Sequence, residues 1–130
     1  MTSNLGRVLI IAGSDAGGGA GLQADVKAVT LLGGFAATAV TAITVQNTLG
    51  VHAVHPLPVD LIASQADAVL DDIGADAVKT GMLGSVEVVE TVAAILDRAQ
   101  APAIVDPVMV AKGGHPLLPV EAVAAVKSLM

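Results

Sequence analysis

The chain has 130 residues, no cysteine and a formal net charge of −6, and it is 54% hydrophobic but only 1% aromatic. This length is enough for one domain with a core, which must be aliphatic, as is usual for a parallel sheet covered by helices. An acidic chain without a basic cluster argues against nucleic acid and anionic membranes as partners, and the lack of cysteine excludes disulfides and thiolate metal sites.

The N-terminal residues do not have the layout of a signal peptide. Every apolar run is interrupted by charge or glycine well before the roughly 18 residues that a membrane span requires. We therefore expect a cytoplasmic protein with neither a membrane nor a nucleic acid as its partner.

Hydrophobic periodicity predicts strands that alternate with helices along the chain. The first strand ends at Gly13, the first helix ends at a Gly33-Gly34 stop signal, and Ser85 is a suitable N-cap for a later helix. Pro119 fits the first position of the last helix. The expected strands cover 7–12, 35–45, 76–79 and 103–105, the expected helices cover 21–32, 59–73, 86–99 and 119–130, and 49–58 is a short strand or excursion at an edge. This order predicts an α/β fold with a mostly parallel, doubly wound sheet and right-handed crossovers.

The first strand runs into a glycine-rich turn, in which five glycines fall within residues 13–21. A strand, a glycine turn and a helix together can present backbone N–H groups to a polar or anionic ligand, although a plain connection is the alternative. The turn is not a P-loop, because no Gly-Lys-Ser/Thr follows it. It contains a relaxed dinucleotide fingerprint, Gly19-x-Gly21-x-x-Ala24, but the next acid after Asp25 is Asp60, which argues against NAD.

Asp25 lies on the apolar face of the first expected helix, together with Leu22, Val26, Val29 and Leu32. A carboxylate on a core face is costly unless it is paired or used. The alternative is an acid near the helix N-terminus that the helix dipole favours.

Polar or glycine clusters follow four of the expected strands. Because ligands of open α/β sheets bind at the carboxyl ends of the strands, we expect these clusters to share one concave edge. Singly, each cluster is equally well explained as a turn or a cap. The clusters are Gly13-Ser14-Asp15, Gln46-Asn47, Gly81-Met82 and Asp106-Pro107, and the strands that end near Ala12, Val45, Lys79 and Val105 are expected to be parallel neighbours.

Five segments together carry a resemblance to a known family: 12–21, 23–27, 41–51, 79–83 and 106–112. In this order they resemble hydroxymethylpyrimidine/phosphomethylpyrimidine kinases of thiamine biosynthesis. That family belongs to the ribokinase-like superfamily, and pyridoxal kinases are its nearest relatives. The resemblance covers nearly the whole chain and implies a ribokinase-like, three-layer αβα fold.

The resemblance also implies roles for individual residues. Asp25 and Gln46 would hydrogen-bond an aminopyrimidine, since an amide offers both a donor and an acceptor. The residues implied to line the pyrimidine pocket are Gly13, Asp25, Gln46, Met82 and Val108, with Met82 and Val108 packed on the ring. Asp106 would face the phosphates and hold Mg²⁺, and Lys112 would lie in a loop near the phosphates.

The implied reaction is transfer of a phosphoryl group from ATP, with Mg²⁺, to 4-amino-5-hydroxymethyl-2-methylpyrimidine and then to its monophosphate. Family members are about twice as long as this chain, so the resemblance makes residues 1–130 the N-terminal, substrate-binding half of one truncated kinase domain. The catalytic residue and most of the ATP site are then expected beyond Met130. The chain alone is expected to be inactive, with an unpaired sheet edge, and the full-length protein to be a homodimer.

Two other functions stay open at this point. One is a non-catalytic pyrimidine-binding module, and the other is a relative of pyridoxal kinases. Asp25 and the uncharged polar cluster Gln46-Asn47-Thr48 favour the pyrimidine.

Overall fold

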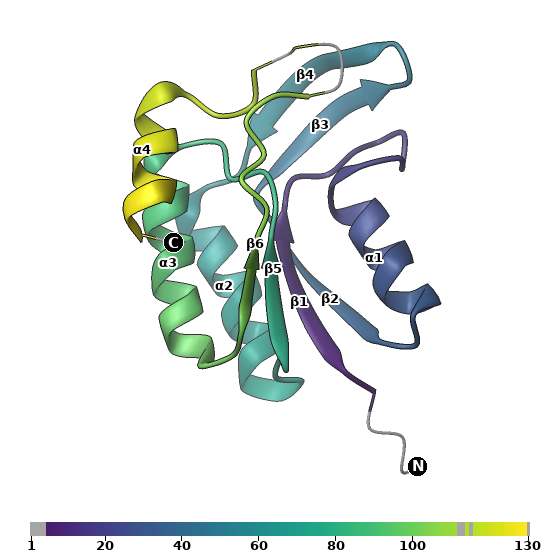
Figure 1. The fold of residues 1–130 in the computed structure, drawn as a ribbon, viewed down its shortest axis with the longest axis vertical. Coiled ribbons are helices and arrows are strands. Elements are labelled where there is room, and N and C mark those ends of the chain that lie inside the picture. Colours follow the sequence, from purple (N-terminus) through teal and green to yellow (C-terminus); the bar gives the residue numbers. More distant parts are fainter. Residues whose placement is uncertain (1–4, 112–113, 115, 130) are drawn as a thin grey trace.

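The computed structural model describes residues 5–111, 114 and 116–129 (Figure 1). Its centre is a parallel sheet of four strands in the order β2-β1-β5-β6. The strands are β1 (Arg7–Ala12), β2 (Phe35–Val40), β5 (Ala77–Thr80) and β6 (Ala103–Val105). The predicted parallel α/β sheet is therefore confirmed for these four strands.

Helices cover both faces of this sheet, which gives three layers (Figure 1). One face carries α1 (Gly21–Leu31), and the other carries α2 (Val59–Asp72), α3 (Val86–Ala99) and α4 (Val120–Leu129). The two faces differ in burial, because no residue of α1 is fully buried. Leu32, which was expected on a buried helix face, is exposed at the C-cap of α1, so that part of the prediction is wrong.

The aliphatic core lies between the sheet and helices α2, α3 and α4. It holds Leu9 and Ile11 of β1 against residues that recur at helical spacing on α2 and α3. Each large aliphatic side chain that is fully buried stabilises the fold by about 1.5–3 kcal/mol relative to an exposed one. The buried helix residues are Ile62 and Ala66 of α2, Val88, Val89, Val92 and Ile95 of α3, and Ala122 and Val126 of α4.

Two helix starts test the capping predictions. Ser85 caps α3, since its side chain accepts the Val88 N–H, which confirms the prediction. Pro119 lies one position before the first residue of α4, and its carbonyl accepts the N–H groups of Ala122 and Val123 at 3.0 and 3.1 Å. It therefore occupies the N-cap and not the first helical position.

The run 35–45 does not form one strand, which corrects the expectation. The chain leaves the main sheet after β2 and forms a second, antiparallel sheet from β3 (Ala42–Asn47) and β4 (Gly50–Pro56). This hairpin projects beyond the carboxyl ends of the parallel strands (Figure 1). The strand that contains Val45 is therefore not a neighbour of β1. Residues 49–58, expected as a short strand or excursion, hold its pairing partner β4.

Side chains explain why the chain turns at Thr41. The Thr41 N–H donates to the Ala12 carbonyl at 2.9 Å, and its hydroxyl donates to the Met82 carbonyl at 2.7 Å. The Gln65 side chain accepts the Val40 N–H at 2.9 Å and donates to the Val40 carbonyl at 3.1 Å. The last residue of β2 thus finds its partners in a side chain, as the pairing rule for buried backbone groups requires.

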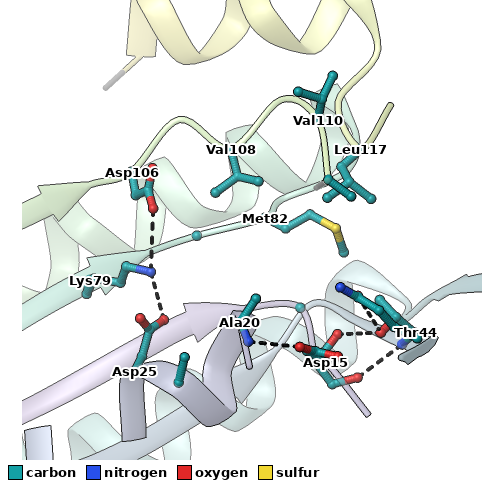
Figure 2. Close-up of a pocket in the computed structure, with 17 residues that line it drawn as sticks. Asp15, Ala20, Asp25, Thr44, Lys79, Met82, Asp106, Val108, Val110 and Leu117 are labelled. Atoms are coloured by element: carbon teal, nitrogen blue, oxygen red, sulfur yellow. Dashed lines mark hydrogen bonds and ion pairs between the residues drawn. The ribbon is translucent and has the colours of Figure 1, made fainter. Parts of the chain in front are cut away.

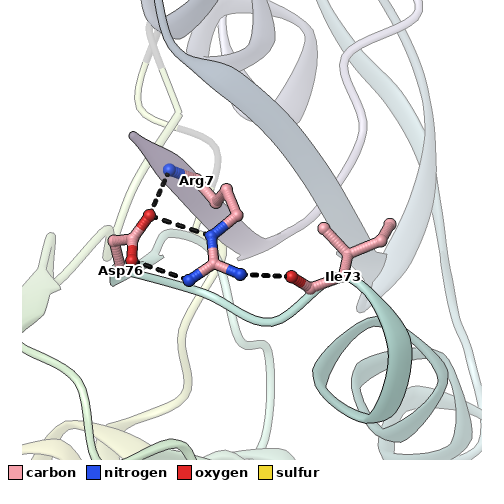
Figure 3. A network of polar contacts seen from close by, with 3 residues as sticks. All are labelled: Arg7, Ile73 and Asp76. Atoms are coloured by element: carbon pink, nitrogen blue, oxygen red, sulfur yellow. Dashed lines mark hydrogen bonds and ion pairs between the residues drawn. The ribbon is translucent and has the colours of Figure 1, made fainter. Parts of the chain in front are cut away.

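An ion pair ties the start of β1 to the connection between α2 and β5 (Figure 3). The Arg7 guanidinium donates to both carboxylate oxygens of Asp76, at 3.0 and 2.8 Å, and to the Ile73 carbonyl. The Arg7 backbone N–H donates to the same carboxylate at 2.8 Å. The side-chain hydrogen bonds from Arg7, followed by its backbone hydrogen bond, hold the pKa of Asp76 well below its usual range.

The main sheet has two edge strands, β2 and β6, as the order of the strands shows. The central residue of β6, Ile104, is 54% exposed, so this edge is open to solvent on the described part of the chain. Among the described residues, no helix combines the length and the apolar character that crossing a bilayer requires.

Candidate functional site

A cavity of about 310 Å³ lies at the carboxyl ends of the parallel strands, where the hairpin reaches over the sheet edge. Its walls are formed by the loops after β1, β5 and β6, the first turns of α1 and strand β3. Of the seven residues expected at a ligand site, six line this one cavity: Gly13, Asp25, Gln46, Met82, Asp106 and Val108. Lys112 lies outside the described residues.

The cavity has one apolar wall and one polar wall (Figure 2). Met82, Val108, Val110 and Leu117 line one side, and the carboxylate of Asp25 lies on the opposite side. A slot of this kind suits a small planar ring whose edge carries polar groups, because small-molecule sites combine apolar lining with a few placed polar groups.

The glycine turn is held together by the side chain of Asp15, which is only 5% exposed. Its carboxylate accepts the backbone N–H groups of Gly17, Gly19 and Ala20 at 2.8, 3.0 and 2.8 Å. These three N–H groups therefore bind an anion that belongs to the chain itself. For these three groups the expectation that the turn offers them to a polar or anionic ligand is wrong, although other residues of the turn line the cavity.

Two glycines of this turn make close contacts. Gly21 has a φ of +59°, and a Cβ there would lie 2.7 Å from the Gly13 carbonyl oxygen. A Cβ at Gly13 would overlap the terminal methyl group of Met82. Glycine at these positions lets the turn approach the start of α1 and lets Met82 lie flat against the cavity.

Asp25 is paired across the cavity floor with a lysine that sequence reasoning left out of the site. The Lys79 Nζ lies 2.7 Å from Asp25 Oδ2 and 4.0 Å from Asp106 Oδ2 (Figure 2). Asp25 lies beyond the first turn of α1, which contains no acid, so the helix-dipole alternative does not explain it. A charged residue within the short apolar strand β5 was the available sequence signal for Lys79.

The hairpin contributes an amide to the cavity. The Thr44 hydroxyl donates to the Ser14 carbonyl at 2.7 Å, and the Thr44 N–H donates to the Ser14 hydroxyl at 3.0 Å, which fixes β3 against the glycine turn. The Gln46 amide oxygen lies 3.3 Å from the Thr44 hydroxyl. Within the described residues the Gln46 amide nitrogen makes no hydrogen bond, so it can donate to a ligand.

Asp106 is the candidate for holding Mg²⁺. No group of three or more acidic, histidine or cysteine side chains suited to a metal occurs in the described part of the chain. Mg²⁺ is commonly held by one or two carboxylates together with waters and substrate phosphates, so a single half-exposed carboxylate at the mouth of the cavity fits that mode. Asp106 would supply the protein ligand, and the phosphates would supply others.

A cavity at the carboxyl edge of a parallel sheet, with one polar and one apolar wall, is typical of α/β proteins that bind small molecules. Residues 15–130 match the family model described as Phosphomethylpyrimidine kinase. The chain belongs to this family. Its solved relatives have the same three-layer, ribokinase-like fold.

The chain is similar to curated and solved relatives over nearly its whole length. The hydroxymethylpyrimidine/phosphomethylpyrimidine kinase of Bacillus subtilis (strain 168) is 54% identical over 125 residues, which are 95% of this chain and 46% of that protein. The crystal structure of phosphomethylpyrimidine kinase from Clostridium difficile 630 has a TM-score of 0.86 and 43% identity, and covers 93% of this chain and 53% of that one.

A pyridoxal kinase is similar as well. The structure of the Staphylococcus aureus pyridoxal kinase in complex with pyridoxal has a TM-score of 0.87 and 38% identity, over 98% of this chain and 47% of that one. Its complex with ADP has a TM-score of 0.86 and 38% identity, over 98% and 46% of the two chains. The present chain thus spans about half the length of the relatives that it matches.

Proposed function

We propose that this chain forms the substrate-binding half of a kinase for 4-amino-5-hydroxymethyl-2-methylpyrimidine and its monophosphate. The observation that carries the proposal is the convergence of Asp25, Gln46, Met82 and Val108 on one cavity of about 310 Å³. Membership of the phosphomethylpyrimidine kinase family supports the same substrate class.

The chemistry of the cavity complements an aminopyrimidine. Asp25 Oδ2 accepts a hydrogen bond from the Lys79 ammonium. Asp25 Oδ1 has no hydrogen bond within the described residues, so this oxygen can accept a hydrogen bond from the exocyclic amino group. The Gln46 amide nitrogen can donate to a ring nitrogen. Met82 and Val108 would pack on the ring. The hydrogen bond to Asp25 would contribute most, because a hydrogen bond to an ionised carboxylate is about twice as strong as a neutral one.

Phosphoryl transfer needs further groups near the hydroxymethyl end of the ring. We place Mg²⁺ at Asp106, where it would neutralise charge on the transferred phosphoryl group, and Lys112 in a loop beside the phosphates. ATP is the proposed donor, supported by the complex of the Staphylococcus aureus relative with ADP. The group that activates the hydroxyl, and most of the ATP site, belong in this proposal to a part of the relatives that residues 1–130 do not span.

Pyridoxal is the second candidate ligand, because a pyridoxal kinase has a comparable TM-score. Pyridoxal has no exocyclic amino group, so a hydrogen bond to Asp25 would have to come from one of its hydroxyl groups. If neither hydroxyl reaches Asp25, pyridoxal forgoes a charge-assisted hydrogen bond worth about 1.5–3 kcal/mol. The cavity chemistry therefore favours the aminopyrimidine.

Calorimetry tests the proposal directly on the folded 130-residue chain. The aminopyrimidine is expected to bind at least tenfold more tightly than pyridoxal, which corresponds to about 1.4 kcal/mol. Gly13→Ala is expected to weaken binding, because its Cβ would overlap the terminal methyl group of Met82, and both residues line the cavity. Gly6→Ala is the matched control, since nothing lies within 4 Å of a Cβ there.

Equal or tighter binding of pyridoxal would favour the second candidate, and absence of binding by the folded chain would contradict the proposal. In an ATP-coupled assay the same chain is expected to give no turnover, because in-line transfer requires ATP to be positioned against the acceptor hydroxyl. Turnover within tenfold of a full-length relative would mean that the nucleotide site lies inside residues 1–130.

A further inference from the structure

Lys79 is the one basic side chain among the described residues that line the cavity. Its side chain is 21% exposed, and that of its partner Asp25 is 23% exposed. The ammonium lies between the carboxylates of Asp25 and Asp106, as Figure 2 shows, at 2.7 and 4.0 Å. Neither the family resemblance nor the proposed substrate contacts give this lysine a role.

The position of Lys79 in the sheet makes this ammonium costly without a partner. In the register of the main sheet, Lys79 pairs with Ile10 of β1 on one side and with Ile104 of β6 on the other. A charged group among aliphatic neighbours must be paired or solvated, and Asp25 supplies the short contact.

Asp25 depends on Lys79 in turn. Among the described residues, Lys79 is the hydrogen-bond donor to Asp25, and the bond engages Oδ2 only. This single contact from β5 holds the carboxylate of a helix that has no fully buried residue. Without it, the Asp25 side chain could rotate, and Oδ1 would no longer be held toward the cavity.

We propose that Lys79 is a positioning residue, which holds Asp25 so that Oδ1 faces the ligand and thereby selects rings that carry a hydrogen-bond-donating amino group. The inference rests on the proposed function, because it assumes that the ring lies in this cavity. Lys79 acts through Asp25 and makes no contact of its own with the ring.

The test compares two ligands by calorimetry on the folded chain: the aminopyrimidine and its analogue that lacks the 4-amino group. The wild-type chain is expected to prefer the amino compound by roughly 10- to 100-fold, the range for a hydrogen bond to a charged group. In Lys79→Met this preference should fall to about twofold or less, while affinity for the analogue changes by no more than about twofold. A purely structural role would weaken both ligands alike.

Two further variants test the mechanism. Lys79→Arg keeps a cation that can donate to Asp25, so it should restore at least part of the preference. Lys27→Met is the matched control, because this lysine contacts the Gly18 carbonyl at 2.8 Å outside the cavity, and it should leave the preference unchanged.

A double-mutant cycle distinguishes positioning through Asp25 from direct contact between Lys79 and the ligand. In an Asp25→Asn background, Lys79→Met should cause no further change in the preference, since the two residues act as one unit. A further loss of the preference in that background would show that Lys79 contacts the ligand and would overturn the inference. The same holds if Lys79→Met weakens binding of the pyrimidine monophosphate but not of the unphosphorylated pyrimidine. A wild-type preference that persists in Lys79→Met would also overturn it, whereas a wild-type chain that binds neither ring would contradict the proposed function itself.

Discussion

Two buried threonines give a matched test of the hydrogen bonding in this fold. Thr80 at the end of β5 is 0% exposed, and Thr41 between β2 and β3 is 1% exposed. The Thr41 hydroxyl donates to the Met82 carbonyl at 2.7 Å, whereas the Thr80 hydroxyl has no partner in the described part of the chain. The small void beside Thr80 has no room for a water molecule. The same substitution should therefore have opposite effects at the two sites.

Replacing Thr80 with valine removes a buried hydroxyl whose lost hydration costs about 1–3 kcal/mol, and the new methyl group adds apolar burial. Thr80→Val should stabilise the chain by about 1–2 kcal/mol. Thr41→Val should destabilise it by about 1–3 kcal/mol, because the Met82 carbonyl loses its donor.

Urea unfolding measures both effects. With an m-value of about 2 kcal/mol/M, a change of 1–2 kcal/mol moves the midpoint by about 0.5–1 M. The midpoint should rise for Thr80→Val and fall for Thr41→Val at an unchanged m-value. A midpoint that falls for Thr80→Val would mean that its hydroxyl is hydrogen-bonded, and the reasoning from the unpartnered hydroxyl would be wrong.

Three further predictions concern the glycine turn and the ion pair at the start of β1. The pKa of Asp76 is lower in the folded chain than its ordinary 3.8, so the stability that Arg7 and Asp76 contribute is present above that pH and is lost as the pH falls below it. Urea midpoints measured across the acid range should show this loss. In Asp76→Asn that part of the pH dependence should be absent. Gly21→Ala should cost more stability than Gly33→Ala. Both positions have a positive φ, +59° and +86°, which costs about 1–2 kcal/mol for alanine. Only the Cβ at Gly21 would also meet backbone atoms. Equal urea midpoints for the two variants would contradict the steric argument. Asp15→Asn should lower stability by about 1.5–3 kcal/mol, because an amide keeps one acceptor oxygen for the three N–H groups that the carboxylate now satisfies; an unchanged thermal midpoint would show that those groups find other partners.

Local signals were enough to predict most elements of the fold. The Ser85 cap, the glycine stop after α1 and the aliphatic runs of β1, β5 and β6 depend on residues close together in the chain. The run 35–45 was misjudged because its composition is that of a strand throughout. The break at Thr41 depends on hydrogen bonds to Ala12 and Met82, which are distant in the sequence.

In the candidate site, too, some features could be predicted from the sequence, whereas others depend on contacts between residues far apart in the chain. The edge rule for parallel sheets predicted that Gly13, Met82 and Asp106 would share one edge, and they line one cavity. The pairing of Lys79 with Asp25 joins residues 54 positions apart, so no spacing rule could predict it. The role of Asp15 was within reach, because an aspartate that is followed by glycines commonly binds the backbone N–H groups just after it.

The break in the expected strand is what brings Gln46 to the cavity. In the main sheet Ala12 pairs with Val40, so a strand that continued straight would carry Gln46 six residues, or about 20 Å, past the end of β1. The chain instead turns at Thr41, whose backbone and hydroxyl bind Ala12 and Met82, and the hairpin lies across the carboxyl ends of the parallel strands. The same threonine thus anchors the hairpin to the end of β1 and to the loop after β5, so Thr41→Val should loosen the Gln46 wall of the cavity as well as the fold.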